Sequence, residues 1–175
     1  RDGIAYSRST DGGSTWSAPV RVNPSAGVAA FTPTVHVLAD GTIGITYFDL
    51  RSNTTDTATL PTELMLARST DTVNWSEVRL TPTFDLITAP QAGGYFIGDY
   101  FGLAASGNVF IPVYVRTTGS TTNRTDVFAV FARSIASSAA RTAKESATAT
   151  APIIATAHPV DETTRQRASD HLGRV

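Results

Sequence analysis

The stretch STDGGSTW, residues 9–16, gathers a carboxylate, two glycines, four hydroxyls and a tryptophan into eight positions. On a loop bent by glycine, the oxygens of Asp11 and Thr15 could hold a cation or a sugar hydroxyl. The other interpretation is a tight turn. In that case Asp11 accepts hydrogen bonds from the backbone N–H groups just after it, Gly13 takes a positive φ, and Trp16 folds back over a hairpin.

A repeat favours the turn. The segment IAYSRSTDGGSTWSAPVRV, residues 4–22, matches LMLARSTDTVNWSEVRL, residues 64–80, and a weaker echo, VFAVFARSI, occurs at residues 127–135. The second copy keeps Asp71 and Trp75 but loses the glycines. A ligand-binding loop does not need a second copy, so we interpret the stretch as a structural turn between two strands.

The segments between these copies predict hairpins. Residues 33–50, PTVHVLADGTIGITYFDL, alternate apolar and polar residues on both sides of Asp40-Gly41, and residues 100–116 do the same around the turn at 106–108. Each unit therefore consists of a strand, a tight turn, a strand, a longer loop, a strand, the STD turn and a strand. That order predicts a four-stranded antiparallel blade.

Blades of this kind bury their faces by stacking around an axis, which predicts an all-β fold and a β-propeller. The chain would hold about two and a half blades: the outer half of one, a whole second and three strands of a third. Since a propeller needs roughly 4–8 blades, we expect missing upstream blades as partners. Residues 1–135 would form the blades, and the Ala/Ser/Thr-rich residues 136–175 would be disordered or marginally helical.

Composition excludes several functions. The chain has 175 residues, 41% of them hydrophobic, with a formal net charge of -1 and no cysteine. These values argue against a nucleic-acid partner, disulfides and thiolate metal sites, and we predict no cofactor and no metal. No apolar stretch approaches the roughly 20 residues that cross a bilayer. Because the chain starts at Arg1 without an initiator Met, we expect a fragment or a processed product.

The turn also carries a family resemblance. Ser9, Asp11, Gly13, Thr15 and Trp16 match every fixed position of Ser-x-Asp-x-Gly-x-Thr-Trp, the Asp-box or BNR repeat. Residues 1 to about 135 resemble part of a six-bladed propeller of the sialidase superfamily, and segments such as GDYFGLAASGNVFIPVYVR resemble those of secreted bacterial BNR-repeat proteins. The resemblance implies a secreted protein and a glycan partner. It does not fix the activity, because fold does not imply function.

Sialidases use a Tyr nucleophile that a Glu makes more basic, an Asp acid/base and three Arg that clamp the substrate carboxylate. By resemblance, Tyr100 after Asp99 stands at the place of the nucleophile, and Arg51 and Arg116, each ending a second strand, are candidate clamp residues. The alternative is that Tyr100 packs at the propeller axis and Asp99 bonds backbone.

Two acidic residues have competing interpretations. Asp49 either hydrogen-bonds sugar hydroxyls near a central groove or pairs locally with Arg51. Glu63 is expected to be solvated rather than catalytic. The family's Glu is missing, because the comparable position before Asp40-Gly41 holds Thr, and this counts against sialidase turnover.

Three hypotheses about function follow. The chain is part of a sialidase-like exo-glycosidase that is inactive without its upstream blades. Alternatively, it belongs to a non-catalytic propeller that binds carbohydrate or protein. The third hypothesis is another glycosidase or a lyase on the same scaffold.

Overall fold

The computed structural model describes residues 2–133, and their regular structure is antiparallel strand apart from one 3-10 turn. The predicted tail lies outside the described residues. Within residues 2–133 no helix is long and apolar enough to cross a membrane. The elements are β1 (Ala5–Tyr6), β2 (Val20–Arg21), β3 (Ala30–Val37), β4 (Ile43–Asp49), β5 (Pro61–Ser69), β6 (Ser76–Arg79), β7 (Phe84–Asp85), η1 (Leu86–Thr88), β8 (Gly102–Ser106), β9 (Val109–Thr117), β10 (Thr125–Ala129) and β11 (Ala132–Arg133).

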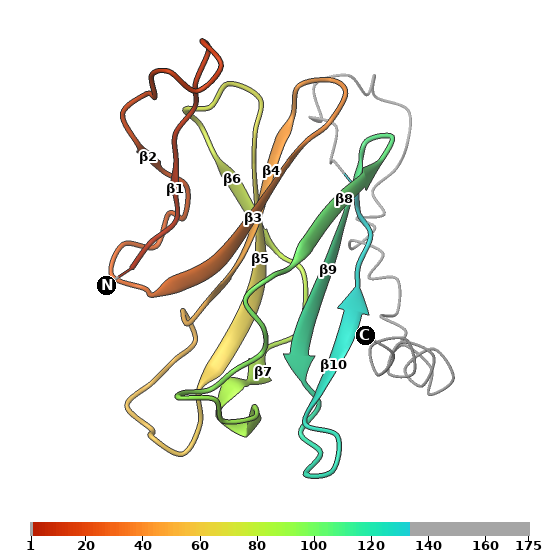
Figure 1. Ribbon diagram of the computed structural model, residues 1–175. Coiled ribbons are helices and arrows are strands. Elements are labelled where there is room, and N and C mark those ends of the chain that lie inside the picture. Colours follow the sequence, from red (N-terminus) through yellow and green to blue (C-terminus); the bar gives the residue numbers. More distant parts are fainter. Residues whose placement is uncertain (1, 134–175) are drawn as a thin grey trace, which may run out of the picture.

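These strands form three antiparallel sheets (Figure 1). The first is the hairpin of β1 and β2. The middle sheet has the order β3-β4-β5-β6, with β7 on the start of β5, and in the third sheet β8, β10 and β11 all pair with β9. The all-β class and the predicted order of strands are confirmed. No sheet closes on itself within the described residues.

Both predicted hairpin turns are present. Gly41 has a φ of 86°, and the Asp40 carboxylate accepts a hydrogen bond from the backbone N–H of Thr42 at 2.9 Å. Gly107, between β8 and β9, has a φ of 57°. A positive φ costs glycine little because it lacks a Cβ, which explains why these residues stand at the turns.

The two STD stretches form turns built around their aspartates. Oδ1 of Asp11 accepts the N–H of Thr15 at 2.9 Å, and its Oδ2 accepts the Thr15 hydroxyl at 2.6 Å. Oδ1 of Asp71 accepts the N–H groups of Val73 and Asn74 at 2.9 and 2.7 Å. Asp11 and Asp71 therefore organise equivalent turns, as the repeat predicts, and Gly13 has the expected positive φ of 94°.

The two tryptophans differ, and the expectation for Trp16 was wrong. Its exposed fraction is 65%, so it does not cover the first hairpin. Trp75 is half-buried against the core, and its ring centroid lies 5.5 Å from that of Tyr6. The reason is position in the stack: Trp75 has the β1–β2 hairpin beside it, whereas no neighbouring sheet within residues 2–133 covers Trp16.

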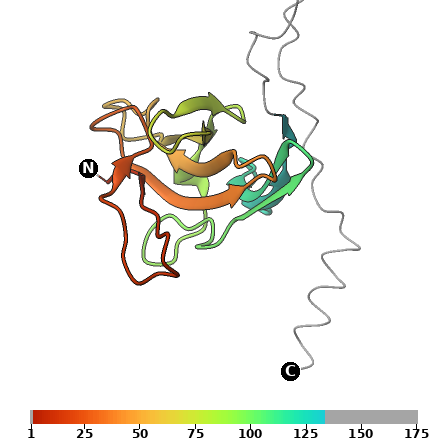
Figure 2. The same cartoon turned by 90° about the horizontal axis from the view of Figure 1, so that it is seen from above.

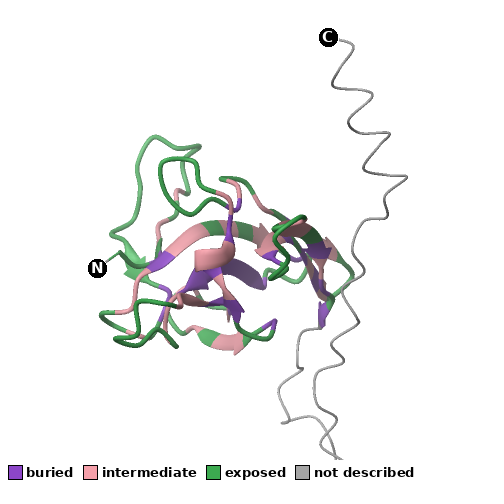
Figure 3. Ribbon diagram, turned by 90° about the horizontal axis from the view of Figure 1, so that it is seen from below, coloured by how far each residue is buried: buried purple, intermediate pink, exposed green. Residues whose placement is uncertain are grey.

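The central strands of the middle sheet, β4 and β5, are buried on both faces (Figures 2 and 3). All seven residues of β4 are buried. One face packs against the third sheet through an aromatic cluster around Phe48, Phe110 and Tyr114. The other packs against the first hairpin through Ile4, Val22, Ile45 and Met65, among others. The middle sheet is therefore the centre of a three-sheet stack.

Gly44 permits the close approach of the third sheet. A Cβ built on Gly44 would lie 2.5 Å from the ring of Phe110, which is completely buried. No real Cβ contact is that short, so a larger residue at position 44 would push β9 away from β4.

The two tryptophans give a test of the stack. Trp75→Ala is expected to lower the free energy of unfolding by about 2–3 kcal/mol, because it removes a partly buried aromatic side chain. Trp16→Ala is expected to change it by less than about 0.5 kcal/mol. Urea unfolding of both variants measures the difference, and equal losses would contradict the assigned environments.

The Asp turns also predict how stability depends on pH. Hydrogen bonds, chiefly from the side chains of Thr15 and Asn74, hold the pKa values of Asp11 and Asp71 well below their ordinary range. Since the unfolded values are about 3.9, this contribution is complete above about pH 4 and is lost as the pH falls through the folded values. Thermal unfolding of an Asp11→Asn/Asp71→Asn variant should therefore show a shallower loss of stability in acid than the wild type.

Candidate functional site

The predicted strand-end residues come to one end of the sheets. β4 and β9 both end at the lower end in Figure 1, away from the hairpin turns. The Thr117 hydroxyl at the end of β9 donates to the carbonyl of Asp85 at 2.9 Å, and Asp85 pairs with Pro61 at the start of β5. We call this the loop end, because residues 50–60 and 118–124 form loops there.

Asp49 and Arg51 form a direct ion pair at the loop end. Nε of Arg51 donates to both carboxylate oxygens of Asp49 at 3.0 and 2.9 Å, and its Nη2 also bonds Asp49 Oδ2. Asp49 is fully buried, whereas 26% of the Arg51 side chain is exposed. Of the two interpretations of Asp49, local pairing with Arg51 is the one that the geometry shows.

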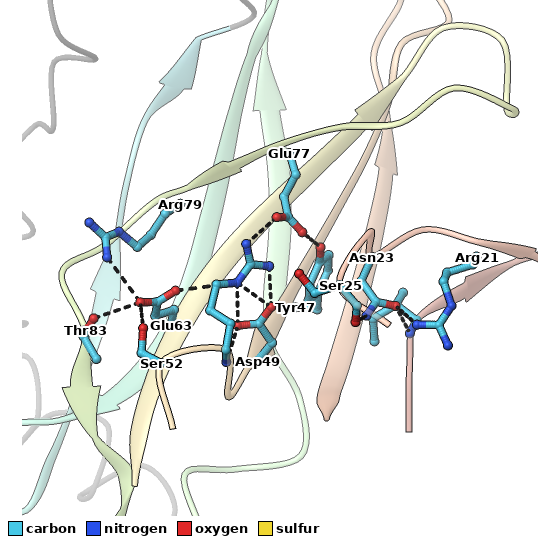
Figure 4. A network of polar contacts seen from close by, with 12 residues as sticks. Arg21, Asn23, Ser25, Tyr47, Asp49, Ser52, Glu63, Glu77, Arg79 and Thr83 are labelled. Carbon is cyan, nitrogen blue, oxygen red and sulfur yellow. Dashed lines mark hydrogen bonds and ion pairs between the residues drawn. The ribbon is translucent and has the colours of Figure 1, made fainter. Parts of the chain in front are cut away.

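The ion pair extends to a tyrosine and a glutamate that sequence reasoning missed (Figure 4). Nη1 of Arg51 donates to Glu77 at 2.6 Å, and the hydroxyl of Tyr47 donates to the other Glu77 oxygen. Burial raises the pKa of Tyr47, and the hydrogen bond to Glu77 raises it further. The Tyr47 phenol therefore stays protonated, and since it is also fully buried it is not available as a nucleophile.

Glu63 joins the same network, and the expectation that it is solvated was wrong. Only 2% of its side chain is exposed, and it accepts hydrogen bonds from Ser52 at 2.7 Å, Thr83 at 3.0 Å and Arg79 at 3.2 Å. Burial alone raises the pKa of Glu63, but these hydrogen bonds outweigh it and leave the pKa below its ordinary value. Partners from three separate segments satisfy this carboxylate, which explains its burial.

The network has three carboxylates and two guanidiniums, a formal charge of -1. Arg51 carries five N–H donors, of which Nε, Nη1 and Nη2 each direct one to a carboxylate. Two N–H donors of Arg51 therefore have no acceptor within residues 2–133, and 26% of its side chain is exposed. The network fixes the start of loop 50–60 and can offer these two donors to a ligand.

Tyr100 and Asp99 lie apart from this network. Tyr100 is 94% exposed, Asp99 is exposed, and neither side chain forms a hydrogen bond within residues 2–133. Asp99 forms no backbone hydrogen bond within residues 2–133, and packing of Tyr100 at a propeller axis stays a prediction, because these residues do not form a closed propeller. Both side chains are open to solvent just before β8.

Arg116 does not join the network either. Its guanidinium carbon lies 4.3 Å from the centroid of the Phe128 ring, and in the strand pairing it stands opposite Asp126. No contact links it to Arg51 in the part of the chain that the structure describes. The two predicted clamp residues thus share an end of the molecule without meeting.

A signal for the missed residues was present in the strand register. Tyr47 and Asp49 stand two positions apart, so they share a face of β4, and Asp49 pairs directly with Glu63. Pairing the strand that ends at Asp49 with the strand after loop 50–60 would have placed Glu63 beside Asp49. The long-range partners Glu77 and Thr83 have no such local signal.

Removing Arg51 should reveal how far the network depends on it. Arg51→Ala leaves Asp49 buried without its partner and is expected to lower the free energy of unfolding by about 3 kcal/mol. The control Arg79→Ala should cost about 0.5 kcal/mol, because Arg79 is 56% exposed and Glu63 keeps Ser52 and Thr83. Urea unfolding would contradict this ranking if the two variants lost equal stability.

Comparisons of this chain with protein-family models, with curated proteins and with solved structures gave no match.

Proposed function

We propose that this chain is part of a sialidase-like β-propeller with Asp-box repeats, and that it binds glycan at the loop end of its sheets. The recurrent Asp turn carries the proposal. Asp11 and Asp71 organise equivalent turns, which join β1 to β2 and β5 to β6 as antiparallel hairpins. Such regular placement of one turn is what a ring of repeated blades needs.

The arrangement of the first strands supports the same proposal. β3 opens the middle sheet and β8 opens the third, and the Thr34 hydroxyl on β3 donates to the carbonyl of Phe101 beside β8 at 3.1 Å. In a propeller, the opening strands of neighbouring blades lie next to each other around the axis. Further blades would extend the stack beyond the two outer sheets.

Two functions share this architecture, and the first is hydrolysis. In a sialidase-like reaction a base takes the proton of the Tyr100 hydroxyl as its oxygen attacks the anomeric carbon, the glycosidic C–O bond breaks, and an acid gives its proton to the leaving oxygen. Water then releases the sugar from the tyrosine. Arg51 has two N–H donors left for a ligand, while the acid/base Asp and further Arg would come from other blades.

The second function is binding without turnover, and a specific observation favours it. A tyrosine nucleophile needs a neighbouring base. Within residues 2–133 the glutamates are Glu63 and Glu77, and both are held in the Arg51 network, with no hydrogen bond to Tyr100. Glycan binding is common to both functions and is the one that the geometry supports best.

Glycan binding can be tested at Asp99, an exposed carboxylate beside Tyr100. On immobilised glycans, Asp99→Asn is expected to weaken binding about fivefold, because a neutral hydrogen bond contributes about 1 kcal/mol less than one to a charged group. The control Asp56→Asn, in the exposed loop 50–60, should bind as the wild type does.

Turnover separates the two candidates. A fluorogenic sialoside would be given to a longer form that carries the upstream blades, with and without Tyr100→Phe. Turnover that Tyr100→Phe abolishes supports hydrolysis, whereas glycan binding with no turnover supports the binding function. If no glycan binds, both candidates fail.

A further inference from the structure

The outer strand of the third sheet has an unpaired edge. β9 lies between β8 on one side and β10 and β11 on the other, and within residues 2–133 no strand pairs with the far side of β10 (Figure 1). The N–H of Val130 donates to the carbonyl of Pro112 on β9 at 3.2 Å. Because alternate residues of a strand direct their backbone groups to opposite sides, those of Val127 and Ala129 point to the open edge.

This edge lacks the features that usually protect an unpaired strand. Edge strands that stay unpaired are commonly short or charged. β6, the outer strand of the middle sheet, has four residues, of which Glu77 and Arg79 are charged. β10 has the sequence TDVFA, and its one charged residue, Asp126, accepts a hydrogen bond from Asn123 at 3.0 Å. Val127 is 41% exposed on the same strand. β10 is therefore an edge suited to pairing with a further strand.

The stacking of the two sheets shows where such a strand would lie. β3 lies beside β8, and the ring of Phe110 on β9 packs against Gly44 on β4. Phe128 on β10 belongs to the same core cluster as Leu66 on β5. β6 is the next strand of the middle sheet, and it has no counterpart in the third sheet within residues 2–133. A strand paired with the open edge of β10 would stand opposite β6.

β5 and β6 line a cleft at this position. Its volume is about 410 Å³, and Leu66, Arg68 and Val78 are among the residues that line it. Leu66 belongs to the core cluster and Val78 packs against it, so the cleft opens on the face that the middle sheet turns toward the third sheet. The guanidinium carbon of Arg68 lies 5.7 Å from the centroid of the Phe110 ring, and its buried Nε has no acceptor within residues 2–133. The cleft therefore combines apolar side chains with a cation that lacks an ion-pair partner.

The carboxylates around the cleft are bound elsewhere. Glu77 on β6 is opposite Ala67, one position along β5 from Arg68, and its oxygens accept hydrogen bonds from Arg51 and Tyr47. In the two neighbouring turns, Asp40 accepts the N–H of Thr42, and Asp71 accepts those of Val73 and Asn74. A carboxylate from outside these residues is therefore the group that can pair with Arg68.

The space opposite β6 fits one extended strand better than a second copy of this chain. Two copies paired antiparallel through β10 would carry their middle sheets on the same side, so the middle sheet of one would meet β6 of the other. In a single strand, side chains two positions apart face the cleft together. β5 and β10 run in the same direction, so in a strand antiparallel to both an acidic residue opposite Arg68 comes two positions before an apolar residue opposite Leu66.

We propose that the open edge of β10 binds an extended peptide segment as an additional antiparallel strand, with an acidic side chain paired with Arg68 and apolar side chains over Leu66 and Val78. Hydrogen bonds to the backbone of Val127 and Ala129 contribute affinity, and the cleft contributes specificity, as in other cases of strand addition. This inference does not depend on the proposed glycan binding.

The first test titrates the 175-residue chain into the fluorescently labelled peptide TETVTVT and follows its anisotropy. This peptide is expected to bind, and TKTVTVT should bind roughly tenfold more weakly, because its lysine would meet the Arg68 guanidinium. Arg68→Gln should remove the preference for TETVTVT. The matched control is Arg8→Gln, which changes the exposed arginine at the same place in the first copy of the repeat and should leave the preference intact.

The second test concerns the backbone pairing. Ala129→Pro removes an N–H at the open edge and should weaken binding roughly tenfold, while the pairing of β10 with β9 is kept. Two forms of the peptide, methylated on alternate backbone nitrogens, test the same point with the unaltered chain, and only the form whose free N–H groups face β10 should bind. The proposal is overturned if both forms bind equally, if TETVTVT and TKTVTVT bind equally, or if neither of these peptides binds.

Discussion

The burial of β4 along its whole length is the constraint on which the rest of the structure depends. A strand buried on both faces must be covered by a sheet on each side, and the β1–β2 hairpin and the third sheet provide that cover. Gly44 lets the Phe110 ring reach β4 on one side. The same burial means that polar groups on β4 need partners inside the protein, since water cannot reach them.

The ion-pair network at the loop end follows from that burial. Asp49 ends β4 fully buried, and an unpaired carboxylate there would be strongly destabilising. Arg51 lies two residues later and satisfies it, while Glu77 accepts one hydrogen bond from Arg51 and another from Tyr47. The result is a rigid start to loop 50–60. This explains why Asp49 and Arg51, residue types typical of a ligand site, have a structural role here.

Features that depend on residues close together in the sequence can be predicted from the sequence, whereas features that depend on neighbours in space cannot. The hairpins at Asp40-Gly41 and at 106–108, and the Asp turns at Asp11 and Asp71, depend on residues within a few positions, so the sequence predicts them. Trp16 and Trp75 stand in equivalent local patterns, yet only Trp75 is covered, because cover depends on the adjacent sheet. The charge of Glu63 predicted a solvated side chain. Glu63 is buried instead, because Ser52, Arg79 and Thr83 donate hydrogen bonds to its carboxylate.

The polar side chains that have no partner inside the protein are those available to bind a ligand. Glu63 and Glu77 are occupied by Arg51 and by their other neighbours, so neither is free to act as the base that a tyrosine nucleophile needs, whereas Arg51 keeps two N–H donors. Within residues 2–133 the side chains of Asp99 and Tyr100 form no hydrogen bond or ion pair, and Tyr100 is almost fully exposed. Residues that the fold does not use, on a loop that the fold holds still, are those most available for a ligand. For this reason the loop before β8, rather than the buried network, is the part of the loop end that best fits glycan recognition.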